Sequence, residues 1–253
     1  MGNSYFLEVT DEKLSTFQND DVVWDFEVHL LYVSNRKNYP EDSYMCGVVD
    51  FFTLDLDELH FSKRTGAFEG AVFHAVEPLM GEEPHFTLHL KNMVTGNLVY
   101  KEKDQISITM NEDAYYYPQD NIYTKFSNEF DQEKSTVSVR LTEDFYVILQ
   151  NEQIVGIVLC NAAYHILPYK KRFMKADLTP NEAYRASFSK YIEFLEHYRD
   201  GDGSIWKPVL LDLLEEVKRN KQDGHYQAMV HGLLNVSENR RFELNLEEQD
   251  FRE

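Results

Sequence analysis

Residues 136–160 read TVSVRLTEDFYVILQNEQIVGIVLC, and this stretch carries most of the evidence for the fold class. It holds two runs rich in β-branched and aromatic residues, Thr136–Leu149 and Gln153–Cys160, separated by Asn151 and Glu152. Residues of this kind are enriched in strands, and polar residues between two such runs mark a turn. The stretch therefore predicts an antiparallel hairpin, with Gly156 as a candidate β-bulge in the second strand.

The chain before this hairpin contains more short runs of the same kind. In the first of them, residues 22–33, Trp24 and Leu30 belong to an apolar set that alternates with Asp25 and His29. Such alternation predicts a strand with one buried face and one acidic, solvated face. Short strands separated by turns favour an antiparallel meander. Polar, tyrosine-rich Asn111–Glu133 is expected to leave the sheet. The other expected strand segments are 45–54, 68–76, 84–91, 93–100 with a turn at Thr95-Gly96-Asn97, and 105–110.

The apolar spacing becomes helical from Leu178 onward. Thr179-Pro180-Asn181-Glu182 predicts a helix start with Thr179 as its cap, and the apolar stripe continues to about Tyr198. Further helices are expected at 204–221 and 226–234, and a candidate final strand at 241–246.

Strands followed by helices predict an α+β fold. We expect a mainly antiparallel β-sheet over about residues 1–160, with a C-terminal helical hairpin packed on it. The predicted division is an antiparallel β-rich domain at 1–165 and a helical subdomain, including the candidate final strand, at 166–253.

The charge of the chain is strongly negative and unevenly distributed. Its 253 residues carry 44 Asp and Glu against 25 Lys and Arg, a net charge of −19. Residues 1–60 hold 13 acidic and 3 basic side chains, whereas residues 166–222 hold 9 and 11. This balance argues against direct binding of nucleic acid or of an anionic membrane. It favours a basic protein partner, or it serves solubility alone.

The two cysteines, Cys46 and Cys160, lie in apolar runs. The first residues do not resemble a secretion signal, and no run approaches the roughly 18 apolar residues of a membrane span. We therefore expect a cytoplasmic protein with reduced thiols. Cys160 precedes Asn161 and His165, but no basic neighbour in the sequence would lower its pKa, so a catalytic thiol is not expected.

Two patterns suggest metal binding and are incomplete. Residues 200–203 (DGDG) match the centre of an EF-hand loop, but the first and last ligand positions are then Tyr198 and Val209. A turn between two helices accounts for this segment better. His85 and His89 would lie about 13 Å apart on a strand, which is too far to share one ion. We therefore expect no metal ion and no cofactor.

Two groups of residues are the candidates for binding a partner. The first is an acidic group, and the second combines acids with three consecutive tyrosines, a composition favoured where proteins dock on proteins. The alternative for the tyrosines is that one or two of them pack onto the sheet. The candidate residues are Asp55, Asp57 and Glu58 in the first group, and Glu112, Asp113, Tyr115, Tyr116 and Tyr117 in the second.

These observations predict a non-enzymatic acidic binding protein. The expected role is that of an inhibitor, such as an immunity protein or a phage-encoded anti-defence protein, that occludes a basic partner. A nuclease or a nucleic-acid-binding complex is the partner of this kind that we consider. Two alternatives stay open, namely an enzyme whose metal-dependent site is assembled from scattered carboxylates and histidines, and a structural subunit whose helices at 180–221 pack on a partner.

Overall fold

The computed structural model describes residues 7–10, 17–25, 29–34, 43–50, 55–75, 78–81, 93–100, 114–167, 178–200 and 203–239. For residues 7–8, 43–50, 55–56, 200, 203 and 235–239 it describes the backbone alone.

The strands form two large sheets and one small sheet. The seven-stranded sheet has the order β7 (Leu79–Met80), β10 (Ala114–Tyr117), β11 (Ile122–Phe126), β14 (Gln153–Leu159), β13 (Phe145–Gln150), β12 (Val137–Arg140) and β8 (Met93–Thr95). The six-stranded sheet has the order β15 (Ile166–Leu167), β2 (Val22–Asp25), β3 (Leu30–Ser34), β6 (Phe68–His74), β5 (Asp55–Ser62) and β4 (Ser43–Asp50). The small sheet pairs β1 (Leu7–Thr10) with β9 (Asn97–Tyr100). Neighbouring strands are antiparallel except for β7–β10, β8–β12 and β2–β15.

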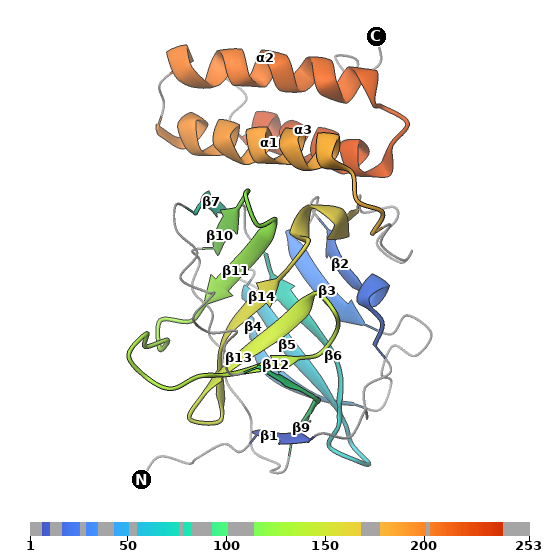
Figure 1. The fold of residues 1–253 in the computed structure, drawn as a ribbon, viewed down its shortest axis with the longest axis vertical. Helices are drawn as coiled ribbons and strands as arrows, with labels where there is room; N and C mark the ends of the chain where they lie inside the picture. Colours follow the sequence, from blue (N-terminus) through green and yellow to red (C-terminus); the bar gives the residue numbers. More distant parts are fainter. Residues whose placement is uncertain are drawn as a thin grey trace.

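Three helices follow the strands and lie together across one end of the β part, opposite β1 and β9 (Figure 1). They are α1 (Glu182–Asp200), α2 (Gly203–Arg219) and α3 (Gly224–Asn239). Two short 3-10 helices, η1 (Asn19–Asp21) and η3 (Ala162–His165), lie in the β part, and η3 joins β14 to β15. This architecture confirms the predicted α+β class, with antiparallel-rich sheets first and helices after them. The domain boundary near residue 165 stays a prediction.

Aromatic side chains from both sheets and from α1 share one hydrophobic core. The ring of Trp24 on β2 lies 4.6 Å from that of Tyr123 on β11 and 5.8 Å from that of Phe188 on α1, measured between centroids. Deeper between the sheets, the rings of Phe73 and Phe145 are 6.0 Å apart. Each fully buried side chain of this size contributes on the order of 1.5–3 kcal/mol to stability. The two sheets are therefore held face to face, and α1 closes one end of their shared core.

The hairpin of β13 and β14 is confirmed. Asn151 and Glu152 both have positive φ values, 50° and 64°, as the tight turn between twisted antiparallel strands requires. The register shifts next to Gly156, where a Cβ atom would lie only 2.4 Å from the Phe126 ring. Glycine is therefore required at this position by close packing against β11.

Two of the expected strands are each divided in two. Residues 22–33 form β2 and β3, and His29 before β3 has a left-handed φ of 53°. Residues 136–149 form β12 and most of β13, because a turn at 141–144 reverses the chain. Asp25 was expected to face solvent and is fully buried. A period-two pattern is the same on both sides of a reversal, so it does not reveal where a strand folds back.

The prediction that residues 111–133 leave the sheet is wrong for most of that segment. Tyr115–Tyr117 belong to β10, and after the turn at Pro118–Asn121 the chain returns as β11. Asn121 takes the left-handed φ of 54° that this turn needs. Aromatic residues favour strands, and here that preference outweighs the surrounding acids.

The helix prediction needs two corrections. The cap of α1 is Asn181 rather than Thr179, because Asn181 Oδ1 accepts a hydrogen bond of 3.0 Å from the backbone N–H of Tyr184. Helix α3 has 16 residues and is longer than expected. The expected strands at 84–91, 105–110 and 241–246 lie outside the described residues.

Candidate functional site

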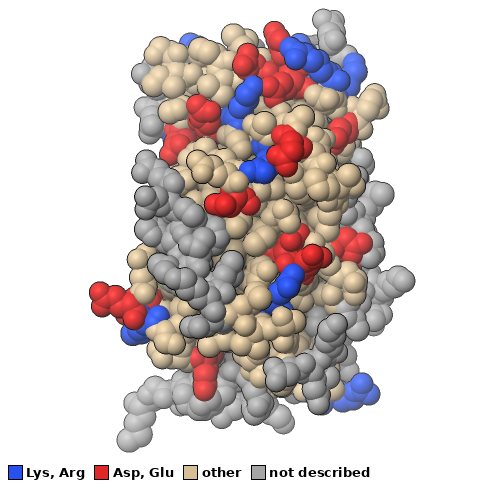
Figure 2. Space-filling model, viewed as in Figure 1, with Lys and Arg blue, Asp and Glu red and all other residues tan. Residues whose placement is uncertain are grey.

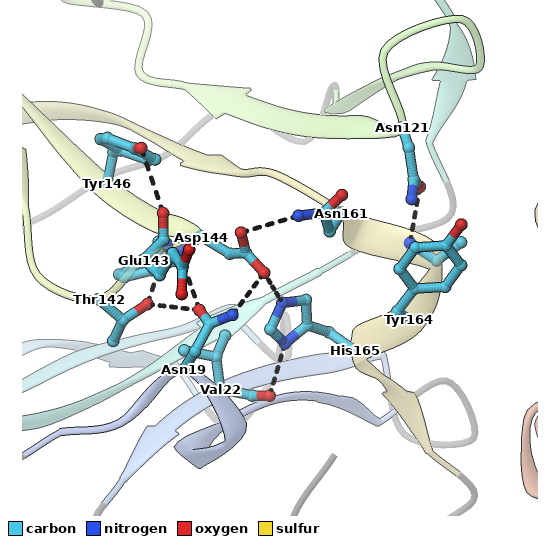
Figure 3. Close-up of polar contacts among 12 residues, drawn as sticks. Asn19, Val22, Asn121, Thr142, Glu143, Asp144, Tyr146, Asn161, Tyr164 and His165 are labelled. Carbon is cyan, nitrogen blue, oxygen red and sulfur yellow. Dashed lines mark hydrogen bonds and ion pairs between the residues drawn. The ribbon is translucent and has the colours of Figure 1, made fainter. Parts of the chain in front are cut away.

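A polar cluster with a buried centre lies where the two large sheets meet, near the end covered by the helices (Figure 3). Its central residue, Asp144, lies in the turn between β12 and β13 of the seven-stranded sheet. Two of the other members come from the connection after β14, and one comes from η1, directly before β2 of the six-stranded sheet. We call this group the Asp144 cluster; its members are Asn19, Thr142, Asp144, Asn161 and His165.

The Asp144 carboxylate has three side-chain partners. It lies 3.0 Å from His165 Nε2 and accepts hydrogen bonds from Asn161 Nδ2 at 2.9 Å and Asn19 Nδ2 at 2.6 Å. Burial by itself would raise the pKa of Asp144, but the hydrogen bonds from His165, Asn19 and Asn161 outweigh it and lower the pKa. The cluster therefore stabilises an ionised carboxylate inside the protein.

Asn19 and Thr142 complete the cluster. The Oδ1 atom of Asn19 accepts from the Asp144 backbone N–H at 2.8 Å and from the Thr142 hydroxyl at 3.1 Å. The same hydroxyl oxygen accepts from the Phe145 backbone N–H at 3.0 Å. Asn19 thus donates a hydrogen bond to the Asp144 carboxylate and accepts hydrogen bonds from the β12–β13 turn. These bonds fix η1 against that turn.

The His165 ring has a polar contact at each of its two nitrogens. Its ring is fully buried, with Nδ1 2.9 Å from the carbonyl oxygen of Val22 and Nε2 at Asp144. Both ring nitrogens are engaged by groups of the protein, so the imidazole is not placed to take a proton from a substrate. The arrangement suits a cross-link between the two sheets.

Cys160 lies beside this cluster and is not activated by it. Burial, with a further contribution from the Asp144 charge, raises the pKa of the Cys160 thiol to about 12. A thiol with this pKa is almost entirely protonated at neutral pH and is a poor nucleophile. That Cys160 is not a catalytic thiol stays a prediction.

The predicted binding residue Asp57 lies inside the protein. Its carboxylate is 3.5 Å from the Lys125 ammonium and accepts from the His74 backbone N–H at 3.0 Å. Lys125 also donates to the His74 carbonyl at 2.7 Å, and both charged side chains are almost fully buried. A buried carboxylate is costly unless it is paired, so Asp57 folds inward against the one lysine of β11. It cannot supply charge at the surface.

Among the described residues, the other acids of the predicted binding site do not form a common surface patch. Glu58 points to His60 at 3.3 Å and is largely covered, with its side chain 16% exposed. Asp55 lies on β5 opposite Asp50, and only its backbone is described. Glu112 and Asp113 lie outside the described residues.

The three tyrosines of β10 have different environments. Tyr115 is 37% exposed, whereas Tyr116 and Tyr117 are buried. The Tyr116 hydroxyl donates to Asn121 Oδ1 at 3.1 Å, and its ring packs edge-on against Phe188 of α1. The alternative that one or two of the tyrosines pack onto the sheet is therefore correct, and only Tyr115 is exposed enough to contact a partner.

A second polar group, which we call the interhelical cluster, joins the three helices. Glu216 of α2 accepts from Lys190 and from the Ser187 hydroxyl, both on α1. The Ser187 oxygen is also 3.1 Å from the Tyr226 hydroxyl of α3. Burial by itself would raise the pKa of Glu216, but the hydrogen bonds from Lys190 and Ser187 lower it. Unlike the Asp144 pair, this pair is partly exposed, by 37% at Lys190 and 25% at Glu216.

Within the described residues, no group of three or more His, Cys, Asp or Glu side chains could hold a metal ion. Two predicted metal candidates fall wholly or partly outside that set: His85 with His89, and the loop containing Gly201 and Asp202. None of the helices in the described part of the chain is long and apolar enough to cross a membrane. Comparison with models of known protein families and with curated protein sequences found no match.

The Asp144 cluster was not predicted from the sequence. Two signals for it were present: Asp144 follows Thr142 in a polar interruption of an apolar run, and His165 follows a run of small and aromatic residues. Polar residues in such places are usually hydrogen-bonded to the fold. Their pairing with Asn19, more than 120 residues away, depends on the packing of the two sheets.

Proposed function

We propose that this protein is a non-enzymatic binding protein whose negative charge attracts a basic protein partner. The supporting observation is that only four acidic side chains among the described residues are buried, Asp21, Asp25, Asp57 and Asp144, against one buried lysine, Lys125. Burying an unpaired charge is costly, so most of the excess negative charge of the sequence belongs at the surface. A field of one sign speeds the encounter with an oppositely charged protein.

The excess negative charge belongs mainly to the β part of the sequence rather than to the helices. Residues 1–177 carry 29 acidic and 15 basic side chains, a balance of −14, whereas residues 178–239 carry 10 and 7. Figure 2 shows Asp and Glu side chains lying beside Lys and Arg over the helices. Ion pairs on the helices include Arg185 with Glu182 and Arg219 with Glu215. The helices therefore contribute little to the net field.

Tyr115 is the proposed anchor for the partner. It is exposed on β10, and the acidic residues Glu112 and Asp113 lie three and two positions before it in the chain. An aromatic ring supplies contact area at low cost in conformational entropy, and neighbouring acids orient a basic partner. Occlusion of a basic surface, as by an immunity protein or a phage-encoded anti-defence protein, is the mode of action that this charge favours. A cytoplasmic location stays a prediction.

The test compares two triple variants of the tagged full chain in a low-salt capture experiment from lysate, with mass spectrometry of retained proteins. The first variant, E112Q/D113N/Y115A, removes two charges and the proposed anchor. The matched control, D212N/E215Q/L211A, removes two charges and one exposed apolar side chain from α2. We expect the wild type and the control to retain a basic protein, and the first variant to lose it.

The association rate with the retained protein provides a second measurement. Electrostatic steering accelerates association by tenfold or more at low ionic strength, so we expect the rate to fall steeply as salt is added. Capture of no basic protein, or an association rate that does not change with salt, would contradict the proposal.

A second candidate function is that of a subunit in a larger assembly. On α2, which lies farthest from the sheets (Figure 1), Leu211 is 65% and Ile205 45% exposed. Exposed apolar side chains on one helix are a feature of surfaces that pack on a partner. Loss of capture by the α2 control variant, with retention by the β10 variant, would favour this function over the first.

A further inference from the structure

The inward side of helix α2 packs on the rest of the protein. Trp206, Leu210, Leu213 and Val217 are buried and follow the helical repeat along one side of α2. The Trp206 ring packs edge-on against the ring of Tyr198 on α1, with the two centroids 5.1 Å apart. This row of side chains accounts for the place of α2 in the fold.

The outward side of α2 carries apolar residues as well. Ile205, Pro208 and Leu211 follow one another at intervals of three and are all exposed, Ile205 by 45% and Leu211 by 65%. Leu211 is the most exposed large apolar side chain in the described part of the protein. Single exposed apolar residues are common, whereas a group of them on one surface is typical of sites that bind a partner. We call these three residues the α2 patch.

The charges of α2 cancel one another. Residues Gly203–Arg219 carry three acidic and three basic side chains, whereas the whole chain has a net charge of −19. Lys207 and Asp212, which are both exposed beside the α2 patch, have opposite signs. A helix without net charge does not attract a basic partner over a distance, so apolar contact is what the α2 patch offers.

The position of α2 determines which partner can reach it. This helix lies farthest from the sheets, with α1 and α3 between it and the β part (Figure 1). If two copies of the protein met at α2, two layers of helices in each copy would separate their β parts by about 40 Å, at roughly 10 Å per helix. Charges farther apart than the Debye length, which is about 8 Å at physiological salt, are largely screened. Two copies of this acidic chain can therefore approach at α2, whereas contact through their β parts would bring like charges together.

We propose that α2 binds a second copy of this chain, and that the two α2 patches form the centre of a symmetric dimer. A twofold contact uses the same surface on both subunits, so each patch covers the other. Dimerisation identifies the partner for the second candidate function, and it does not depend on the capture of a basic protein by β10. One helix from each copy makes a small interface, so we expect a dissociation constant on the order of 10 µM.

Sedimentation equilibrium of the full chain, with no other protein present, measures this association directly. Between about 1 µM and about 200 µM protein at physiological salt, we expect the wild type to pass from monomer to dimer. The variant I205E/L211E places carboxylates in the contact and should weaken association at least about tenfold. A wild type that stays monomeric over the whole range would overturn the proposal.

The matched control is M93E/V137E. Met93 on β8 and Val137 on β12 are 45% and 37% exposed, so this variant adds the same charge at exposed apolar positions away from α2. We expect the control to dimerise like the wild type. Equal weakening in the two variants would show that added charge alone is responsible, and would contradict a contact at α2.

Mixing two variants tests whether α2 meets α2 of the second copy. Leu211→Glu and Leu211→Lys should each associate more weakly than the wild type. An equimolar mixture should regain association, because opposite charges then meet across the twofold contact. No gain on mixing would contradict a symmetric dimer centred on the α2 patch.

The effect of salt separates this dimer from the proposed basic partner. At 0.01 M salt the Debye length is about 30 Å, so repulsion between the two acidic β parts acts across the helices. We expect dimerisation to strengthen as salt rises from about 0.01 M to about 0.15 M, whereas capture of a basic protein should weaken. Dimerisation that weakens with added salt would contradict the proposal. Loss of capture with an intact dimer would overturn the first proposed function alone.

Discussion

The Asp144 cluster and the interhelical cluster use the same chemistry in different surroundings. In each, a carboxylate is joined to a basic side chain and to neutral donors, and in each the pKa of the carboxyl group is lowered. His165 is fully buried and the Asp144 side chain is only 7% exposed, whereas Lys190 and Glu216 are reached by water. Water can replace a lost partner in the second cluster more readily than at the buried pair of His165 and Asp144. Burial, rather than the identity of the pair, should therefore set the cost of breaking each one.

The largest effect should come from His165→Ala, because it leaves the buried Asp144 carboxylate without its imidazole partner. We expect the free energy of unfolding, measured by urea denaturation, to fall by about 3–5 kcal/mol. The control is His197→Ala, which removes a half-exposed imidazole from α1 and should change stability by no more than about 0.5 kcal/mol. Equal losses in the two variants would remove the distinction between the buried and exposed regions.

The pH dependence of stability should identify Asp144 as well. Its pKa is lower in the folded protein than in the unfolded chain, so its contribution is complete above the usual carboxyl range and is lost as the pH falls through the lowered pKa. In Asp144→Asn, the slope of stability against pH on the acid side should decrease by up to about 1.4 kcal/mol per pH unit. Urea denaturation at a series of acid pH values measures this slope. An unchanged slope would mean that the Asp144 carboxylate is equally easy to protonate in the folded and the unfolded states.

Glu216→Gln tests the partly exposed cluster. Glutamine keeps the shape and can still accept from Ser187, but it loses the ion pair with Lys190. We expect a loss of about 1–2 kcal/mol at low salt, and a smaller difference from wild type as salt is added. A loss as large as that of His165→Ala would show that the helices depend on this cluster more than its exposure indicates.

The smallest effect is expected for Arg219→Ala on α2. Arg219 pairs with Glu215 one turn earlier, and both side chains are 69% exposed. Exposed pairs of this kind contribute roughly 0.3–0.5 kcal/mol. Thermal unfolding should show little change, and a loss above about 1 kcal/mol would mean that Arg219 has a role beyond this pair.

Local patterns predicted part of the fold well. The hairpin at Asn151-Glu152 and the first helix followed from strand-forming runs, turn residues and an apolar stripe, all of which act over a few residues. The same patterns did not divide residues 22–33 into two strands, because the apolar alternation continues through the reversal. They also assigned Tyr115–Tyr117 to a loop, because the neighbouring acids hid a short strand.

The candidate binding residues show a different limit. Composition marked Asp57 as part of an acidic surface, but the residue that neutralises it, Lys125, is 68 positions away and on the other sheet. No local pattern connects the two. The period-two rule does not explain the burial of the tyrosines, because Tyr115 and Tyr117 share one face of β10 and only Tyr115 is exposed. Their burial depends on what packs around β10.

The amino-acid sequence by itself determined the α+β class, the order of strands and helices, and the large negative charge, because propensity, periodicity and ionisation are properties of short segments. Only the tertiary structure decided which acids are buried and paired, and that His165 lies between Val22 and Asp144. The reason is physical: the energy of a buried charge depends on which distant groups surround it, and those neighbours exist only after the two sheets and the helices have packed together.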